Sequence, residues 1–150
     1  MPIEVDYQTD IVRGMRSQGG FAEKLANKFK KGIPDLLLKL PEWRYPLFLE
    51  AKLVKVMPLK HYRIETTALQ RLCLKSMRDA GMHAGILLIV PKTRGAADLV
   101  ISWDIDATTM LLEYASHRTY RRSTGEDWGE AIRALLSDNV PTDDFILEGK

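Results

Sequence analysis

Six consecutive apolar residues, GILLIV at positions 85–90, constrain the fold more than any other segment of this chain. A strand with one face in water alternates apolar and polar residues, whereas a strand covered on both faces is apolar throughout. The run is also far shorter than the roughly 20 apolar residues that cross a bilayer. We therefore expect this segment to be a strand inside a β-sheet that is covered on both sides.

The length and composition favour one globular domain spanning residues 1–150. A chain of 150 residues, 45% hydrophobic and 28% charged, can bury one substantial core and is short for two. The acidic N-terminus lacks the order of a secretory signal, and Cys73, the only cysteine, has no internal disulfide partner. These features predict a protein of the reducing cytoplasm with no membrane association.

Hydrophobic spacing predicts a series of helices and strands along the chain. We expect helices at 7–17, from a cap at Thr66 or Thr67 to Gly81, and at 127–136 with Thr124 as a candidate cap. Strands are expected at 34–40 and 47–53, joined as a hairpin by the PEWRYP connection, and at 99–105 and 108–114. For the residues after Gly20, a short strand and a turn remain open alternatives.

The hairpin carries charged residues where its strands should enter the core. Strand alternation puts Glu50 and Lys52 on the same face, and symmetric pairing about the connection places Asp35 opposite Glu50 and Ala51. Two carboxylates held this close repel each other unless a cation lies between them. Mg²⁺ fits such an oxygen-only ligand set, to which the backbone carbonyl of Ala51 is a candidate addition. Lys52 would lie beside the metal, where it can stabilise negative charge during phosphodiester hydrolysis.

The order of these residues resembles the PD-(D/E)xK nuclease superfamily. Gly-Ile-Pro-Asp at 32–35 precedes the hydrophobic hairpin, Glu50-Ala51-Lys52 ends it, and the next helix opens with Gln70. The pattern is most similar to the VRR-NUC branch, small phage and bacterial nucleases that include Holliday-junction resolvase-like enzymes. The resemblance implies an α/β, restriction-endonuclease-like fold: a central mixed β-sheet flanked by helices, with an α-β-β-β-α-β core. It covers residues 7–90, and we expect 91–150 to be a family-specific C-terminal extension packed on the same domain.

The resemblance also implies a role for each motif residue. In the family the aspartate and the glutamate bind the metal and the lysine assists the nucleophile, roles that fall on Asp35, Glu50 and Lys52. The family's glutamine near the active site falls on Gln70, so all four are candidate catalytic residues.

One position departs from the family pattern. The family usually supplies a further acid from the first helix, and alignment on the Gly19-Gly20 pair places Gln8 at that point. Asp10 is our first candidate for the missing metal ligand, ahead of Asp6 and Glu4.

The charge distribution suggests a polyanionic partner, although the net charge is only +2. Between positions 13 and 31 there are six basic residues and one acid, and such segregation produces a local positive field. The candidate nucleic-acid-binding residues are Arg13, Arg16, Lys24, Lys28, Lys30 and Lys31. A solvated lysine-rich surface is the alternative interpretation.

The combined prediction is a divalent-metal-dependent DNA endonuclease. The resemblance implies Mg²⁺, with Mn²⁺ as a substitute, no small-molecule cofactor, a branched DNA or Holliday-junction substrate, and a homodimer in a bacterial or phage-infected cell. Because Gln8 replaces an acid, the alternative is a catalytically degenerate nucleic-acid-binding module with the same fold. Phosphate contacts alone do not distinguish DNA from RNA.

Overall fold

The computed structural model describes residues 4–25, 32–54, 61–91, 96–111, 118–121 and 127–147. The helices in this part of the chain are α1 (Glu4–Ser17), α2 (Ala68–Asp79), α3 (Asp127–Asp138) and a 3₁₀ turn (Asp143–Phe145). The strands are β1 (Phe21–Lys24), β2 (Leu36–Lys39), β3 (Leu47–Leu53), β4 (His61–Arg63), β5 (His83–Pro91), β6 (Ala96–Ser102), β7 (Thr109–Leu111) and β8 (Arg118–Arg121).

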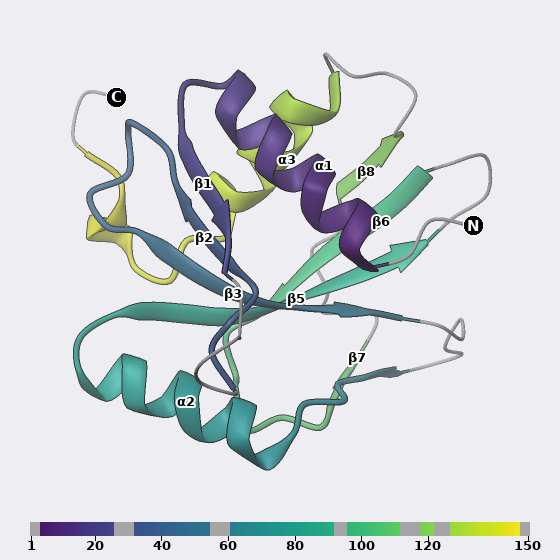
Figure 1. Cartoon of the computed structure of the whole chain (residues 1–150), viewed down its shortest axis with the longest axis vertical. Coiled ribbons are helices and arrows are strands. Elements are labelled where there is room, and N and C mark those ends of the chain that lie inside the picture. The colour runs from purple at the N-terminus through teal and green to yellow at the C-terminus, as the bar shows by residue number, and fades with distance from the viewer. Residues whose placement is uncertain are drawn as a thin grey trace.

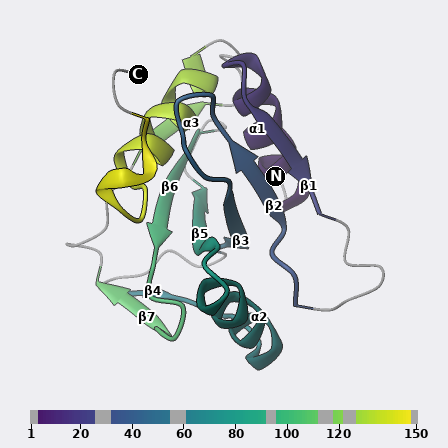
Figure 2. The same cartoon turned by 90° about the vertical axis from the view of Figure 1, so that its left-hand side faces the viewer.

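The strands form a six-stranded mixed sheet in the order β1-β2-β3-β5-β6-β8 and a separate two-stranded sheet of β4 and β7. In the large sheet only β3 and β5 are parallel to each other, and the other neighbours are antiparallel. Helices α1 and α3 cover one face, and α2 and the β4–β7 pair lie on the other (Figures 1 and 2). The expected mixed α/β sheet is therefore confirmed, and only β4 interrupts the predicted α-β-β-β-α-β order.

Strand β5 explains why two cores form. Leu87 and Ile89 belong to the core beneath α1 and α3, whereas Ile86 and Leu88 belong to the core beneath α2. All residues from Ala84 to Val90 are buried, as the uninterrupted apolar run predicts. Strands β6 and β8, from the second half of the chain, complete this same sheet.

The predicted hairpin of β2 and β3 has the expected register. Leu36 pairs with Leu49, which places Asp35 at the level of Glu50 where β2 begins. Within the connection, Trp43 is fully buried and contacts Phe145 edge to face at 5.3 Å. Trp43 therefore belongs to the core.

Helix α2 begins and ends where the sequence predicts. The Thr67 side chain accepts a hydrogen bond from the Gln70 backbone at 3.1 Å, and the Gln70 side chain accepts one from the Thr67 backbone at 2.9 Å. This reciprocal pair is a capping box, which satisfies two backbone N–H groups at the helix start. Gly81, at φ +88°, follows the C-terminal cap in a conformation that suits glycine.

Other elements differ from the sequence predictions. Helix α1 starts at Glu4 rather than at residue 7, since Glu4 and Asp6 are favourable in a first helical turn. The strand expected near 108–114 is described only as Thr109–Leu111 and pairs with β4, which the sequence did not predict. Strand β8, which the sequence did not predict, pairs with β6. Thr124 lies outside the described residues.

Within the described residues, no helix is both long and apolar enough to cross a membrane.

Candidate metal centre at the end of strand β3

The candidate site lies where β3 extends past its pairing with β2. Beyond the Leu36–Leu49 pair, no strand of the described residues lies along the side of β3 that faced β2. The Asp35 carboxylate occupies this edge of β3, where its Oδ2 accepts a hydrogen bond from the Ala51 backbone N–H at 2.9 Å. Asp35 is therefore fixed beside β3 by a backbone contact.

Glu50 is the most perturbed group of the site. Its side chain is 3% exposed, and its Oε1 lies 2.9 Å from Gln70 Nε2 and 3.5 Å from Lys52 Nζ. The pKa of Glu50 is raised from 4.5 to about 8, chiefly by burial and also by the neighbouring Asp35, while Lys52 acts in the opposite direction. Its second oxygen, Oε2, is buried and has no hydrogen-bond partner among the described residues.

An unsatisfied carboxylate oxygen next to a second carboxylate fits a divalent cation. A buried carboxylate oxygen without a partner is costly, and two adjacent carboxylates cannot both be ionised cheaply. A cation between Asp35 and Glu50 removes both costs. Mg²⁺ typically uses one or two carboxylates and completes its octahedron with water and substrate oxygens, so this donor set suits it.

The backbone carbonyl of Ala51 points to the same edge. In a β-strand the N–H and C=O of one residue face the same neighbour, so the Ala51 carbonyl is directed toward the side where Asp35 binds the Ala51 N–H. Its placement is compatible with the predicted ligand role.

Glu4, in the first turn of helix α1, reaches this edge. Glu4 Oε2 accepts a hydrogen bond from the Leu53 backbone N–H at 3.1 Å, and its Oε1 lies 3.4 Å from Gln8 Nε2. Glu4 precedes Gln8 by one helical turn and so shares its face. That spacing was the available signal for Glu4, although it ranked below Asp10 in the sequence prediction.

Asp10 does not join the carboxylate pair. It is buried, but it follows Gln8 by two positions and so lies on a different face of α1, the face of Gly14. That face packs on α3, because a Cβ at Gly129 would lie 3.3 Å from the Gly14 carbonyl. Among the described residues no three Asp, Glu, His or Cys side chains form a metal-binding group. The site therefore offers two carboxylates, and none of Glu4, Asp6 and Asp10 forms such a group with them.

Gln70 connects α2 to the site. Its backbone and side-chain oxygen belong to the capping box, which leaves the side-chain amide free to donate to Glu50. Gly32, at φ +91°, allows the chain before Asp35 to pass close to α2, since a Cβ there would lie 2.9 Å from the Leu69 carbonyl. Local geometry thus places Gln70 and the Gly32–Asp35 segment beside each other.

Three of the six predicted nucleic-acid contacts line a groove between α1 and β1. The groove has a volume of about 400 Å³ and is lined by Thr9, Val12, Arg13, Arg16, Glu23 and Lys24. Arg16 is partly neutralised by Glu23 at 2.9 Å, whereas Lys24 donates to the neutral Thr9 hydroxyl at 2.9 Å. Lys24 pairs in register with Leu36, so the groove begins at the Asp35 end of the sheet. Lys28, Lys30 and Lys31 lie outside the described residues.

The acidic pair at Asp104 and Asp106 has a local role. The Asp106 backbone N–H donates to Asp104 Oδ1 at 3.1 Å, so this pair forms a turn.

Comparisons with known proteins find similarity among solved structures. No protein-family model and no curated protein matches the sequence. Among solved structures, the chain is similar to Hjc, a Holliday junction resolvase from the archaeal hyperthermophile Archaeoglobus fulgidus, with a TM-score of 0.48. The match has 19% identity and covers 79% of this chain and 88% of that chain. The functional argument therefore depends on the site itself.

Proposed function

We propose that this protein is a divalent-metal-dependent DNA endonuclease of the PD-(D/E)xK type. The observation that carries the proposal is the Asp35–Glu50 pair. It places a buried carboxylate oxygen, without a hydrogen-bond partner among the described residues, beside a second carboxylate, with Lys52 and Gln70 in contact with the same group. A cation and a scissile phosphate together account for this arrangement.

Each residue has a defined task in phosphodiester hydrolysis. When bound, Mg²⁺ would polarise the phosphate and make a water molecule a stronger nucleophile at neutral pH. Asp35 and Glu50 would hold it, with the Ala51 carbonyl as a further ligand. Lys52, with 22% of its side chain exposed, presents its ammonium group to the phosphate oxygens as their negative charge grows in the transition state. Gln70 fixes Glu50 Oε1 and so orients the other oxygen.

The basic groove supplies a path for the DNA backbone. Arg13, Arg16 and Lys24 lie along α1 and β1, and the groove begins at the end of the sheet that carries Asp35. Such contacts position phosphates without reading sequence. We extend this track to Lys28, Lys30 and Lys31 as a prediction.

The finer features of the proposal come from the sequence resemblance. They are a branched-DNA or Holliday-junction substrate, membership of the VRR-NUC branch, Mn²⁺ as a substitute metal, and one domain that includes residues 91–150. A homodimer acting in the cytoplasm of a bacterium or a phage-infected cell completes the proposal, since two symmetry-related sites suit a two-stranded cut.

A second candidate function is a binding module that has lost catalysis. It is favoured by Gln8, which is buried where the family pattern has an acid, and by the two-carboxylate composition of the site. This module would bind DNA in the presence of a chelator and cut nothing.

The test is cleavage of labelled four-way junction, flap, linear duplex and single-stranded DNA with Mg²⁺ or Mn²⁺. The wild type is compared with Asp35→Asn and with Glu130→Gln, an exposed acid of α3 outside the site that serves as a matched control. Cleavage that needs the metal, survives Glu130→Gln and is abolished by Asp35→Asn with binding intact supports the proposal. Binding without cleavage under any divalent ion supports the degenerate module instead.

A further inference from the structure

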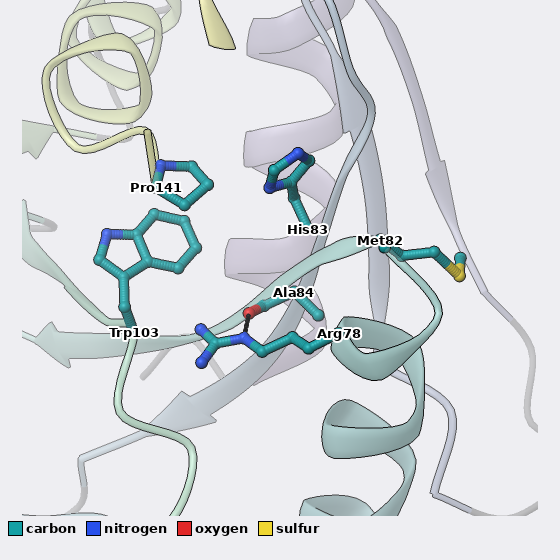
Figure 3. Close-up of a pocket in the computed structure, with 7 residues that line it drawn as sticks. Arg78, Met82, His83, Ala84, Trp103 and Pro141 are labelled. Atoms are coloured by element: carbon teal, nitrogen blue, oxygen red, sulfur yellow. Dashed lines mark hydrogen bonds between the residues drawn. The ribbon is translucent and has the colours of Figure 1, made fainter. Parts of the chain in front are cut away.

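A second cavity lies at the opposite end of the sheet from the carboxylate pair. Its volume is about 330 Å³, which is at the lower end of the range for ligand pockets. His83, on its wall, pairs with Leu47 at the start of β3, whereas Glu50 pairs with Ile86 further along. Figure 3 shows the labelled lining residues, Arg78, Met82, His83, Ala84, Trp103 and Pro141.

The walls of this cavity suit a planar ligand. Trp103 lies against Gly85, since a Cβ at that glycine would come within 2.6 Å of two carbons of the indole ring. Pro141 is beside the indole in Figure 3, and His83 stands on the other side of the cavity. His83 is supported from behind by Tyr45 at 4.9 Å and Phe145 at 5.0 Å between ring centroids. The rings are therefore braced before any ligand enters.

Arg78 supplies directional hydrogen-bond donors. Its Nε donates to the Ala84 carbonyl at 2.8 Å, which fixes the guanidinium group, and its two Nη atoms point toward the Trp103 side of the cavity (Figure 3). Burial lowers the pKa of Arg78, while the charges of Asp104 and Asp106 act in the opposite direction. Because these two carboxylates are near, a bare phosphate is a poorer occupant than an uncharged ring that carries hydrogen-bond acceptors.

We propose that this cavity binds one unstacked nucleobase of the nucleic-acid substrate, with the ring against Trp103 and its acceptor atoms toward Arg78. Aromatic side chains and arginine planes are the usual platforms for bases that have left the stack. The inference rests on the proposed function, because it takes the ligand from the DNA that the carboxylate site would cut.

Helix α2 sets the distance between the two sites. Gln70 contacts Glu50, and Arg78 contacts the cavity, on the same helix. Eight residues of α-helix span about 12 Å. At about 3.4 Å per nucleotide along a strand, that is three to four nucleotides. A base held here would restrict cleavage to DNA with an unpaired base at that distance from the scissile phosphate, such as DNA at a branch point.

The first experiment tests the cavity without any need for cleavage. Guanosine or adenosine is titrated into the wild-type protein in a chelating buffer while tryptophan fluorescence is recorded. We expect saturable quenching that Trp103→Phe removes and that Arg78→Met weakens about tenfold, while Arg71→Met, on the same helix but outside the cavity, leaves it unchanged. Absence of saturable quenching, or quenching that survives Trp103→Phe, would overturn the proposal.

The second experiment uses Asp35→Asn protein and DNA with one unpaired base or with an abasic site at the same position. The abasic DNA should bind about tenfold more weakly, the size expected for one stacked base. Trp103→Ala should weaken binding to the base-bearing DNA by the same factor. It should leave the affinity for the abasic DNA unchanged. Equal losses on both DNAs would mean a merely structural role for Trp103 and would overturn the inference. If the protein binds no DNA, the proposed function fails, and the nucleoside titration still decides whether the cavity binds a base.

Discussion

Replacing Glu50 by Gln should make the metal-free protein more stable at neutral pH. A buried acid whose pKa is raised keeps its proton in the folded state at a pH at which the unfolded chain releases it. The stability contributed by this proton is therefore complete below the ordinary pKa of 4.5 and is lost as the pH rises toward about 8. Glutamine ionises in neither state, so Glu50→Gln removes this loss.

The size of the effect follows from the shift. With a folded-state pKa of about 8, the free energy of unfolding of the wild-type protein falls relative to strongly acidic solution. The decrease is up to roughly 1 kcal/mol at pH 5, 3 kcal/mol at pH 7 and 4 kcal/mol at pH 8. The weak ion pair with Lys52 at 3.5 Å offsets a small part of the gain in the variant. The difference in free energy of unfolding between Glu50→Gln and the wild type should accordingly grow by about 2–3 kcal/mol from pH 5 to pH 8.

Urea unfolding in a chelating buffer at pH 5, 7 and 8 measures this gain. Glu42→Gln is the matched control, because Glu42 is also buried but is paired with Arg133 at 2.6 Å. Removing that partner should destabilise the protein, in the opposite direction to Glu50→Gln. If Glu50→Gln is destabilising at pH 8, or if the difference from the wild type does not grow between pH 5 and pH 8, the account of Glu50 is refuted.

Three further predictions concern catalysis and DNA binding. Lys52→Met should lower the single-turnover cleavage rate by roughly 10²–10³-fold with DNA affinity nearly unchanged; a change in affinity alone would contradict its role. Gln70→Ala and Thr67→Ala should each cost about 1 kcal/mol in urea unfolding through the lost capping box. Only Gln70→Ala should also slow cleavage, because Gln70 contacts Glu50 through its side chain. Equal slowing in both variants would argue against a positioning role. Arg13→Gln should weaken binding to all DNA sequences alike and reduce the salt slope by about one, as measured by fluorescence anisotropy across a salt series.

The sequence is sufficient to predict the hairpin and its three charged residues. The position of Asp35 opposite Glu50 follows from counting outward from the PEWRYP connection, and the capping box at Thr67 follows from residue type and spacing. Both depend on contacts that are close in sequence or fixed by strand alternation. The same is true of β5, whose uninterrupted apolar run reflects two covered faces.

The remaining features depend on contacts between distant segments. The pairing of β4 with β7 joins residues nearly 50 positions apart, and no local pattern encodes it. The different positions of Asp10 and Glu4 also depend on contacts between distant segments. Asp10 lies closer in sequence to Gln8, but the helical period places Glu4 on the shared face and β3 brings the Leu53 N–H to it.

The central claim is that Asp35 and Glu50 together hold a divalent cation, and calorimetric titration of Mn²⁺ or Mg²⁺ at pH 7 tests it most directly. A carboxyl group must release its proton to bind a metal, and with a pKa of about 8 Glu50 is mostly protonated at this pH. Titrations in buffers of different ionisation enthalpy should therefore show release of nearly one proton per bound cation, and Glu50→Gln should remove both the binding and the proton release. Binding without proton release, or binding that survives Glu50→Gln, would contradict the account.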